Sequence, residues 1–340
     1  MSIHTRSFGT TSKGEQATLF SITNQNGVVL ELTDYGAIWV STKIPTKNGV
    51  TDVILGLDSA GNYEPSKGHL GGVIGRNANR ISNAAFTLDG TKYQLEVTGT
   101  DPVLNIHSGP NCYDRRMWDA TILEKENAVR FTLNSPDGDQ GFPGNLTLHV
   151  TYVLTEDNTV KLIYDGISDA KTLLNITNHV YFNLNGHDSG TVWKHLLHVD
   201  STRITETKSG LPTGTLLPVA GTKYDLTSMK EVEHEFDDNW CKEPHHILDK
   251  ARITCIGDKS GIRMDVYTDL PGVQIYTGNG LNVPNGKHGT SYAKGDGICF
   301  ETQYYVDAIN IDSPEFDKPI LEANTPFHTE TWYKFSTSEK

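Results

Sequence analysis

The stretch Leu146-Thr-Leu-His-Val-Thr-Tyr-Val153 alternates apolar and polar side chains along its whole length. Successive side chains of a strand point to opposite faces of a sheet, so this alternation is typical of a strand with one buried face. Similar segments lie on either side of it, at Ala128–Leu133 and Val160–Tyr164, and polar, turn-forming residues connect them. Three such segments in succession predict an antiparallel meander.

Strand-like segments recur along the rest of the chain, whereas helical periodicity is scarce. Further strands are expected at Val28–Leu32, Val53–Leu55, Ile262–Tyr267, Val273–Tyr276 and Ile298–Thr302. Asp89-Gly90 predicts a hairpin turn, and short helices are expected at Asp58–Tyr63 and Leu226–Glu233. Many short strands at this spacing predict an all-β fold, a large antiparallel β-sandwich or barrel with few short helices. We expect residues 1–340 to form a single domain, a size that all-β domains reach.

Composition argues against several classes of partner. The net charge is -13 and no basic block is present, whereas nucleic acids and acidic membrane surfaces attract basic patches. We therefore expect no nucleic-acid partner and no membrane partner. The N-terminal residues lack an apolar signal segment, no run is long enough to span a membrane, and the four cysteines are scattered. These features predict a cytoplasmic protein with free thiols.

Two polar residues within apolar runs are the candidates for chemistry. His179 lies in the strand-like run Leu173–Leu184 between two asparagines, and Glu301 follows the apolar segment Ile298–Phe300. Histidine can give and take a proton near neutral pH, and a buried carboxyl group tends toward a raised pKa. Together they form a usable acid–base pair. The sequence has no motif for a nucleotide or a metal ion, so we expect no cofactor and no metal.

Seven segments, in this order along the chain, resemble the aldose 1-epimerase (galactose mutarotase) family. Besides the runs around His179 and Glu301, they are Gly75–Ile81, Phe86–Tyr93, Leu104–Gly109, Asp137–Gly144 and Phe236–Trp240. Gly75-Arg-Asn-Ala-Asn-Arg-Ile81 is similar to the family's Gly-Arg-x-x-Asn-Arg-Ile, and Asp137–Gly144 to its Asp-Gly-x-x-Gly-Tyr/Phe-Pro-Gly. The chain departs from the family at Ser108, which replaces the first glycine of Leu-His-Gly-Gly, and at Asp238, which replaces a histidine.

This resemblance implies a galactose mutarotase-like supersandwich. It also implies an isomerase of carbohydrate metabolism that interconverts the α and β anomers of free aldoses, galactose or glucose, by acid–base opening and reclosure of the sugar ring. Glu301 would be the base, and His179 the acid at the ring oxygen. The implied substrate-binding residues are His107, Arg80, Asn79 and Asp237.

Several alternatives stay open from the residues alone. Arg76 could be the functional arginine in place of Arg80, and Asp238 could contact the sugar in place of Asp237. A hexose-6-phosphate 1-epimerase would need extra cationic groups near the motifs, where Lys and Arg are sparse. A glycoside hydrolase would use two carboxylates, and a non-catalytic carbohydrate-binding β-sandwich would need no acid–base pair. The sequence does not reveal a preference between galactose and glucose.

Overall fold

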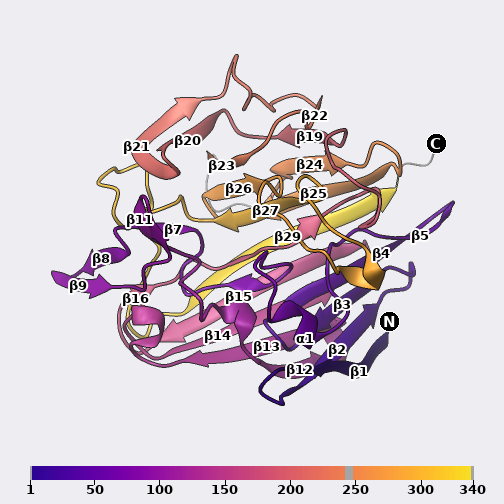
Figure 1. Ribbon diagram of the computed structural model, residues 1–340, viewed down its shortest axis with the longest axis horizontal. Helices are drawn as coiled ribbons and strands as arrows, with labels where there is room; N and C mark the ends of the chain where they lie inside the picture. Colours follow the sequence, from indigo (N-terminus) through magenta and orange to yellow (C-terminus); the bar gives the residue numbers. More distant parts are fainter. Residues whose placement is uncertain (1, 242–247, 338–340) are drawn as a thin grey trace.

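Three antiparallel sheets dominate the computed structural model, which describes residues 2–241 and 248–337 (Figure 1). The five-stranded sheet contains β1 (Ser2–Thr10), β2 (Gln16–Thr23), β3 (Val29–Thr33), β4 (Ile38–Thr46) and β5 (Gly49–Asp52). The nine-stranded sheet has the order β12 (Asp119–Leu123), β13 (Ala128–Ser135), β14 (Leu146–Leu154), β15 (Thr159–Ser168), β29 (Phe327–Thr337), β25 (Ile262–Thr268), β24 (Ile253–Ile256), β19 (Leu196–Val199) and β22 (Lys230–Glu231). The six-stranded sheet has the order β18 (Tyr181–Phe182), β27 (Ile298–Gln303), β26 (Gly272–Tyr276), β23 (Asp237–Cys241), β20 (Arg203–Lys208) and β21 (Leu211–Pro218).

Short strands and turns connect the large sheets. They are β6 (Val73–Ile74) with β17 (Thr177–Asn178), β7 (Arg80–Ser82) with β10 (Gly99–Thr100) and β11 (Val103–Ile106), β8 (Ala85–Leu88) with β9 (Thr91–Gln94), and β16 (Thr172–Leu173) with β28 (Ile320–Leu321). Helical structure in the described ranges is limited to α1 (Ala60–Tyr63) and the 3-10 turns Tyr113–Arg115, Glu124–Glu126, Asp139–Gly141 and Lys287–Gly289. None of the helices in these ranges is long and apolar enough to cross a membrane.

Most of the predicted strands are confirmed. The predicted meander is the run β13–β14–β15, and Asp89-Gly90 joins β8 to β9. The strand expected at Val53–Leu55 is reduced to one bridge, between Ile54 and Phe182. The helix expected at Leu226–Glu233 is wrong, because this segment contains β22 and pairs with β19. Its Thr-Ser start is a weak helix former, so pairing at the sheet edge prevails.

One hydrophobic core joins the three sheets into a sandwich. Phe20 of β2 packs on Phe131 of β13, with ring centroids 5.7 Å apart. Trp39 of β4 and Phe182 of β18 both pack on Tyr333 of β29, at 5.3 Å each. The five-stranded and six-stranded sheets therefore cover the same face of the nine-stranded sheet, and the predicted all-β sandwich is confirmed. This shared core supports the single domain that we propose for the chain.

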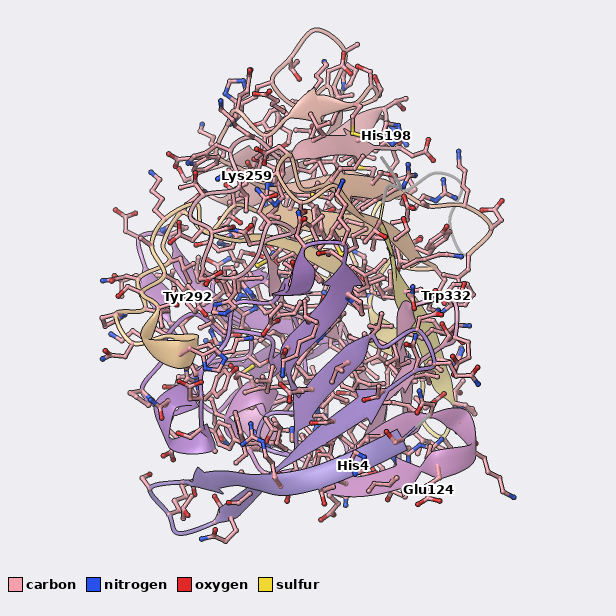
Figure 2. All side chains as sticks on the ribbon, turned by 90° about the vertical axis from the view of Figure 1, so that its right-hand side faces the viewer. His4, Glu124, His198, Lys259, Tyr292 and Trp332 are labelled. Carbon is pink, nitrogen blue, oxygen red and sulfur yellow. The ribbon has the colours of Figure 1, made fainter. Side chains whose placement is uncertain are left out.

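The two sides of the sandwich differ in character. Figure 2 places Trp332 and Tyr292 on opposite sides of the molecule. Trp332 lies on β29, where it alternates with the buried Tyr333 and thus faces outward from the nine-stranded sheet. Tyr292 lies in the connection between β26 and β27 and shares a second, smaller core cluster with Tyr181 and Val283. The loops on this second side surround the pocket described below.

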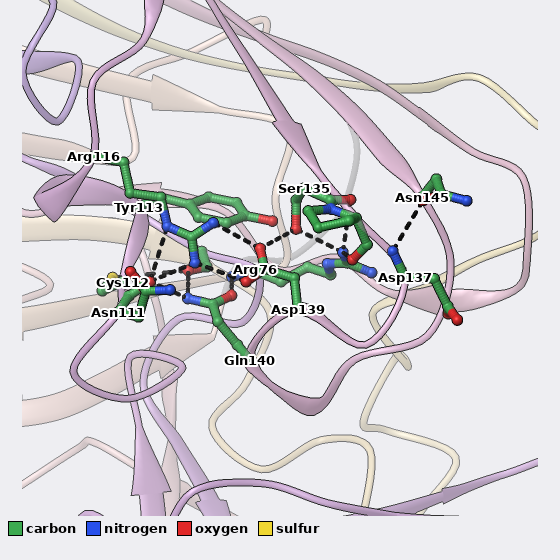
Figure 3. A network of polar contacts seen from close by, with 12 residues as sticks. Arg76, Asn111, Cys112, Tyr113, Arg116, Ser135, Asp137, Asp139, Gln140 and Asn145 are labelled. Atoms are coloured by element: carbon green, nitrogen blue, oxygen red, sulfur yellow. Dashed lines mark hydrogen bonds and ion pairs between the residues drawn. The ribbon is translucent and has the colours of Figure 1, made fainter.

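Arg76 organises the connection between β13 and β14 (Figure 3). The side chain is fully buried. Its guanidinium donates to the carbonyl groups of Pro143 and Gly144 at 2.6 and 3.0 Å, and to the hydroxyl of Ser135 at 2.7 Å. Arg76 is therefore a structural residue that holds the glycine-rich loop, and the hypothesis that it is the functional arginine is not supported. The Asp137–Gly144 segment has the turn-shaping role that its glycines and proline predict.

We expect Arg76→Met to lower the free energy of unfolding by about 2–4 kcal/mol, because it leaves several buried carbonyl groups without a partner. Equilibrium unfolding in urea would measure this loss. Arg130→Met is the matched control: Arg130 is partly exposed on β13, and its guanidinium donates to the hydroxyl of Thr151. Its cost should stay below about 0.5–1 kcal/mol. Equal costs for the two variants would contradict the structural role of Arg76.

Candidate active site

One pocket is lined by all six residues that the sequence predicts for the site. It has a volume of about 340 Å³. The predicted residues on its wall are Asn79, Arg80, His107, His179, Asp237 and Glu301. They come from five separate segments that lie far apart in the sequence, so only the fold brings them together. Arg76 and Asp238, the two open alternatives, do not line this pocket.

The pairing of β7 with β11 positions Asn79, Arg80 and His107. Arg80, the first residue of β7, lies opposite Ile106, the last residue of β11. Asn79, just before β7, and His107, just after β11, therefore lie next to each other on the pocket wall. The backbone amide of His107 donates to the Asn79 carbonyl at 3.0 Å, and the amide of Asn79 donates to Nδ1 of His107 at 3.2 Å. The two pocket residues therefore hold each other through one bond between backbone groups and one from a backbone amide to the imidazole ring.

Ser108, the departure from the family's glycine, has a structural explanation. Its φ of 63° lies in the left-handed region that favours glycine. The hydroxyl compensates by accepting from the amide of Asn77 at 2.8 Å and donating to the Asn77 carbonyl at 3.0 Å. This contact ties the His107 segment to Gly75–Ile81, which carries Asn79 and Arg80.

His179 lies between two very short strands rather than in the middle of a continuous one. Its amide donates to the carbonyl of Gly72, and its carbonyl accepts from the amide of Gly71, both at 2.9 Å. The neighbouring Asn178 donates to the Gly71 carbonyl at 2.8 Å. The asparagine next to the histidine thus braces the backbone that fixes His179.

Glu301 lies on β27, an interior strand of the six-stranded sheet. Its neighbours Ile298 and Phe300 face the hydrophobic core, so strand alternation turns Cys299 and Glu301 to the other face. The same alternation on β23 places Asp237 on the pocket side. Across the ladder, Gln274 lies opposite Glu301 and donates to Oδ1 of Asp237 at 2.8 Å.

The carboxyl group of Glu301 has one oxygen near His179 and one without a protein partner. Nε2 of His179 lies 3.7 Å from Oε1 of Glu301. Oε2 is buried and has no hydrogen-bond partner among the described residues. Burial, assisted by the charge of Asp237, raises the pKa of Glu301 to about 8. Burial, together with the charge of His69, lowers the pKa of His179 to about 3. At neutral pH the resting pair is therefore uncharged: the carboxyl group holds the titratable proton and the imidazole is neutral.

The partners behind the rings determine which nitrogen of His179 and of His107 faces the pocket. Nδ1 of His179 lies 3.5 Å from Sγ of Cys299. Burial raises the pKa of the Cys299 thiol well above its usual value, so the thiol keeps its proton and can either donate to Nδ1 or accept from it. Both tautomers of neutral His179 are compatible with this contact, and in both Nε2 faces Glu301. Nδ1 of His107 accepts from the Asn79 amide, so Nε2 of His107 carries the proton. His107 therefore presents an N–H donor to the pocket.

Arg80 and Asp237 form the charged side of the pocket. Nη2 of Arg80 lies 3.0 Å from Oδ2 of Asp237. Nη1 of Arg80 donates to Oδ1 of Asn79 at 3.3 Å. Because the two ionic side chains are partly exposed, their remaining donors and acceptors are accessible to a polar ligand.

The wall also contains three aromatic or imidazole residues that the sequence did not predict as site residues, His69, Tyr181 and Tyr276. Tyr181 stacks on His179 at 5.1 Å, and Tyr276 meets the same ring edge-on at 6.0 Å. Tyr181 is at the same time a core residue, 2% exposed. His69 also stacks on His179, at 5.9 Å. Nothing distinguished His69 from the other histidines in the sequence except its glycine-rich surroundings.

The pocket also contains a set of potential metal ligands. One ligand atom each from His107, His179 and Glu301 lies within 4.8 Å of the others. Two histidines and one carboxylate are ligands that zinc accepts. The same three groups suffice for acid–base chemistry without a metal. The expectation of a metal-free reaction therefore stays a prediction.

Comparisons with known proteins agree on one family. A sequence profile described as aldose 1-epimerase matches residues 18–334. The chain is 35% identical to an aldose 1-epimerase of Haemophilus influenzae, over 93% of this chain and 95% of the relative. It is also 35% identical to a galactose mutarotase of Rattus norvegicus, over 91% of each. The crystal structure of a GalM/aldose epimerase homologue from C. elegans superposes with a TM-score of 0.87 at 28% identity, over 95% of this chain and 100% of that one.

The family match spans most of the length, and the relatives are similar in size, so the resemblance seen in the sequence and the expected supersandwich are confirmed. The chain therefore belongs to the aldose 1-epimerase family, the isomerases that interconvert the anomers of aldoses.

Proposed function

We propose that this protein interconverts the α and β anomers of free galactose, glucose or both, with Glu301 as the base and His179 as the acid. The observation that carries this proposal is the unpartnered, buried Oε2 of Glu301, a carboxyl group whose other oxygen lies 3.7 Å from Nε2 of His179 in a polar pocket. A carboxylate oxygen without a protein partner is suited to accept a proton from a ligand. The relatives named galactose mutarotase support the choice of sugar.

The proposed reaction needs two coordinated proton transfers. Glu301 removes the proton of the C1 hydroxyl while His179 protonates the ring oxygen. The bond between C1 and the ring oxygen breaks, and the open aldehyde forms. After rotation about the C1–C2 bond, the C5 hydroxyl attacks the other face of C1, returns its proton to His179, and the new C1 oxygen takes a proton from Glu301. Protons and electrons balance without an external reagent.

The number of protons on the pair stays the same throughout this cycle. Burial favours the uncharged resting arrangement, with the proton on Glu301. The proposed reaction uses the alternative arrangement, a Glu301 carboxylate and a protonated His179. A sugar hydroxyl that donates to Oε2 favours the carboxylate. The thiol of Cys299 can accept from Nδ1–H when His179 becomes protonated, so its contact persists in both states.

The remaining predicted residues would hold the sugar. His107 would donate from Nε2 to the ring oxygen, beside His179. Arg80, Asn79 and Asp237 would bind ring hydroxyls through the free donors and acceptors of their network. General acid–base help contributes roughly 10²- to 10⁴-fold to a rate, so this positioning must contribute the remainder.

Other functions find less support in the pocket. A sugar phosphate would need several free cations, but the cationic wall residues are Lys67 and Arg80, and Arg80 is paired with Asp237. A glycoside hydrolase acting through Asp237 and Glu301 would release reducing sugar from a glycoside, which separates it from the proposed isomerase. We further infer a cytoplasmic location and no nucleic-acid or membrane partner, on the composition given above.

The central test replaces Glu301 by Gln. We expect kcat for the conversion of fresh α-galactose, followed by polarimetry in the presence of a chelator, to fall by about 10²- to 10⁴-fold, because the base is lost while the side chain keeps its size. His179→Asn should cause a similar loss. The two substitutions act on one proton relay, so the double variant should lose far less than the product of the single losses. A near-wild-type rate in Glu301→Gln would eliminate the mechanism.

The pH dependence of the rate follows from the one titratable proton that Glu301 and His179 share. The raised pKa of Glu301 keeps this proton bound up to about pH 8. Above that value the pair loses it, and kcat/KM should fall about tenfold per pH unit. The lowered pKa of His179 places the acidic limb far below neutrality, near pH 3. Polarimetry corrected for the spontaneous reaction would show this profile; a rate still rising above pH 9 would contradict it.

Asp237 and Asp238 provide a paired test of sugar binding. Asp237 lines the pocket and bonds Arg80 and Gln274, whereas Asp238 is excluded from the wall by strand alternation. Asp237→Asn should lower kcat/KM by roughly 10- to 100-fold, since a charged hydrogen bond is lost, with a raised KM. Asp238→Asn should change it by less than about threefold. The opposite ranking would mean that Asp238 is the sugar ligand.

A further inference from the structure

His69 is a third histidine of the pocket, and it is held from behind. Its Nδ1 lies 2.7 Å from Oδ2 of Asp114, which is 6% exposed. Burial alone would raise the pKa of Asp114, but His69 and Arg115 hold it below its usual value, so the carboxylate is charged. A charged acceptor fixes the proton of His69 on Nδ1. The backbone of His69 has a φ of 53°, a conformation that few non-glycine residues adopt.

This anchoring leaves Nε2 of His69 as the nitrogen available to a ligand. The side chain is 20% exposed and lies on the pocket wall. Among the described residues, none forms a hydrogen bond with this nitrogen. A fixed ring with one free, accessible nitrogen is an arrangement suited to binding a ligand hydroxyl.

The position of His69 places it near the C5 substituent of a sugar bound in the proposed orientation. Its ring centroid lies 5.0 Å from that of His107 and 5.9 Å from that of His179. Glu301 approaches the Nε2 edge of His179, whereas His69 covers a face of the same ring. In the proposed reaction His107 and His179 contact the ring oxygen, and Glu301 exchanges the proton of the C1 hydroxyl. The other carbon bonded to the ring oxygen is C5, which carries the hydroxymethyl group of a hexose.

We propose that His69, held by Asp114, hydrogen-bonds the hydroxymethyl group of a hexose and thereby favours hexoses over pentoses. This assignment rests on the proposed function, because it uses the orientation of the sugar given above. The wall beside His69 supports it: Lys67 and Ile106 line both the pocket and the adjoining surface groove, so a substituent on C5 has room there.

The test compares three sugars that share the galactose configuration at C2, C3 and C4. Galactose has the hydroxymethyl group, 6-deoxygalactose has a methyl group in its place, and L-arabinose has neither. Removing one hydrogen bond between neutral groups typically costs about 2- to 10-fold in an equilibrium constant. His69→Ala should therefore lower kcat/KM for galactose by about 2- to 10-fold more than for 6-deoxygalactose or L-arabinose.

The comparison between sugars removes the general effects of the substitution. Loss of stacking on His179 would lower all three rates together, so only the ratio of rates bears on the proposal. His4→Ala is the matched control, since His4 is exposed on β1 and remote from the pocket wall. Its ratios should equal those of the wild type. Equal losses with all three sugars in His69→Ala would overturn the proposal.

A second measurement covers the case in which His69→Ala does not fold. In the wild-type protein, the ¹⁵N resonance of the free His69 nitrogen should shift with galactose and shift far less with 6-deoxygalactose. Equal shifts with both sugars would also overturn the proposal. The proposed function has a separate outcome: if the wild-type protein does not accelerate the rotation change of galactose at all, that function fails, whatever the His69 ratios.

Discussion

Burial of the Glu301 carboxyl group is the constraint on which the rest of the site depends. An ionised carboxylate is costly in an apolar interior, and such a group stays protonated unless a partner stabilises its charge. Glu301 is 2% exposed and has one oxygen without a partner. A loop could change its conformation and expose such a carboxyl group to water. β27 cannot, because β18 and β26 pair with it on both sides and its other face packs in the hydrophobic core.

The same strand alternation that buries the core also selects the residues of the site. Ile298 and Phe300 face the nine-stranded sheet, so Cys299 and Glu301 must face away from it. Cys299 then lies behind His179, where its thiol orients the ring, and Glu301 lies in front of the Nε2 edge. β27 therefore supports both groups: it carries Glu301 and, through Cys299, it positions His179.

Part of this arrangement was readable from the sequence. Alternation and turn residues predicted the meander, the hairpin and the strand that carries Glu301, because these depend on local periodicity. The roles of the six predicted residues came from the resemblance to the family, and the structure places all six around one pocket. Local patterns failed at Leu226–Glu233, where pairing with a distant strand determined the conformation.

The pairing of His69 with Asp114 could not be predicted from the sequence. Its partner Asp114 is 45 residues away, and both belong to irregular connections whose path is set by the packed sheets. No period of two or of 3.6 relates such residues, so a pattern cannot pair them.

The back-side partners explain how three neighbouring histidines can differ in chemistry. A backbone amide fixes His107, a thiol fixes His179 and a carboxylate fixes His69. The amide can only donate and the carboxylate can only accept, so each permits one arrangement of the proton on Nδ1. The thiol can do both. The amide therefore keeps His107 in one protonation state, whereas His69 and His179 can each gain and lose a proton on Nε2 without breaking the anchor. Of these two rings, His179 has its Nε2 3.7 Å from Glu301, and this proximity to the proposed base suits it to the role of the general acid.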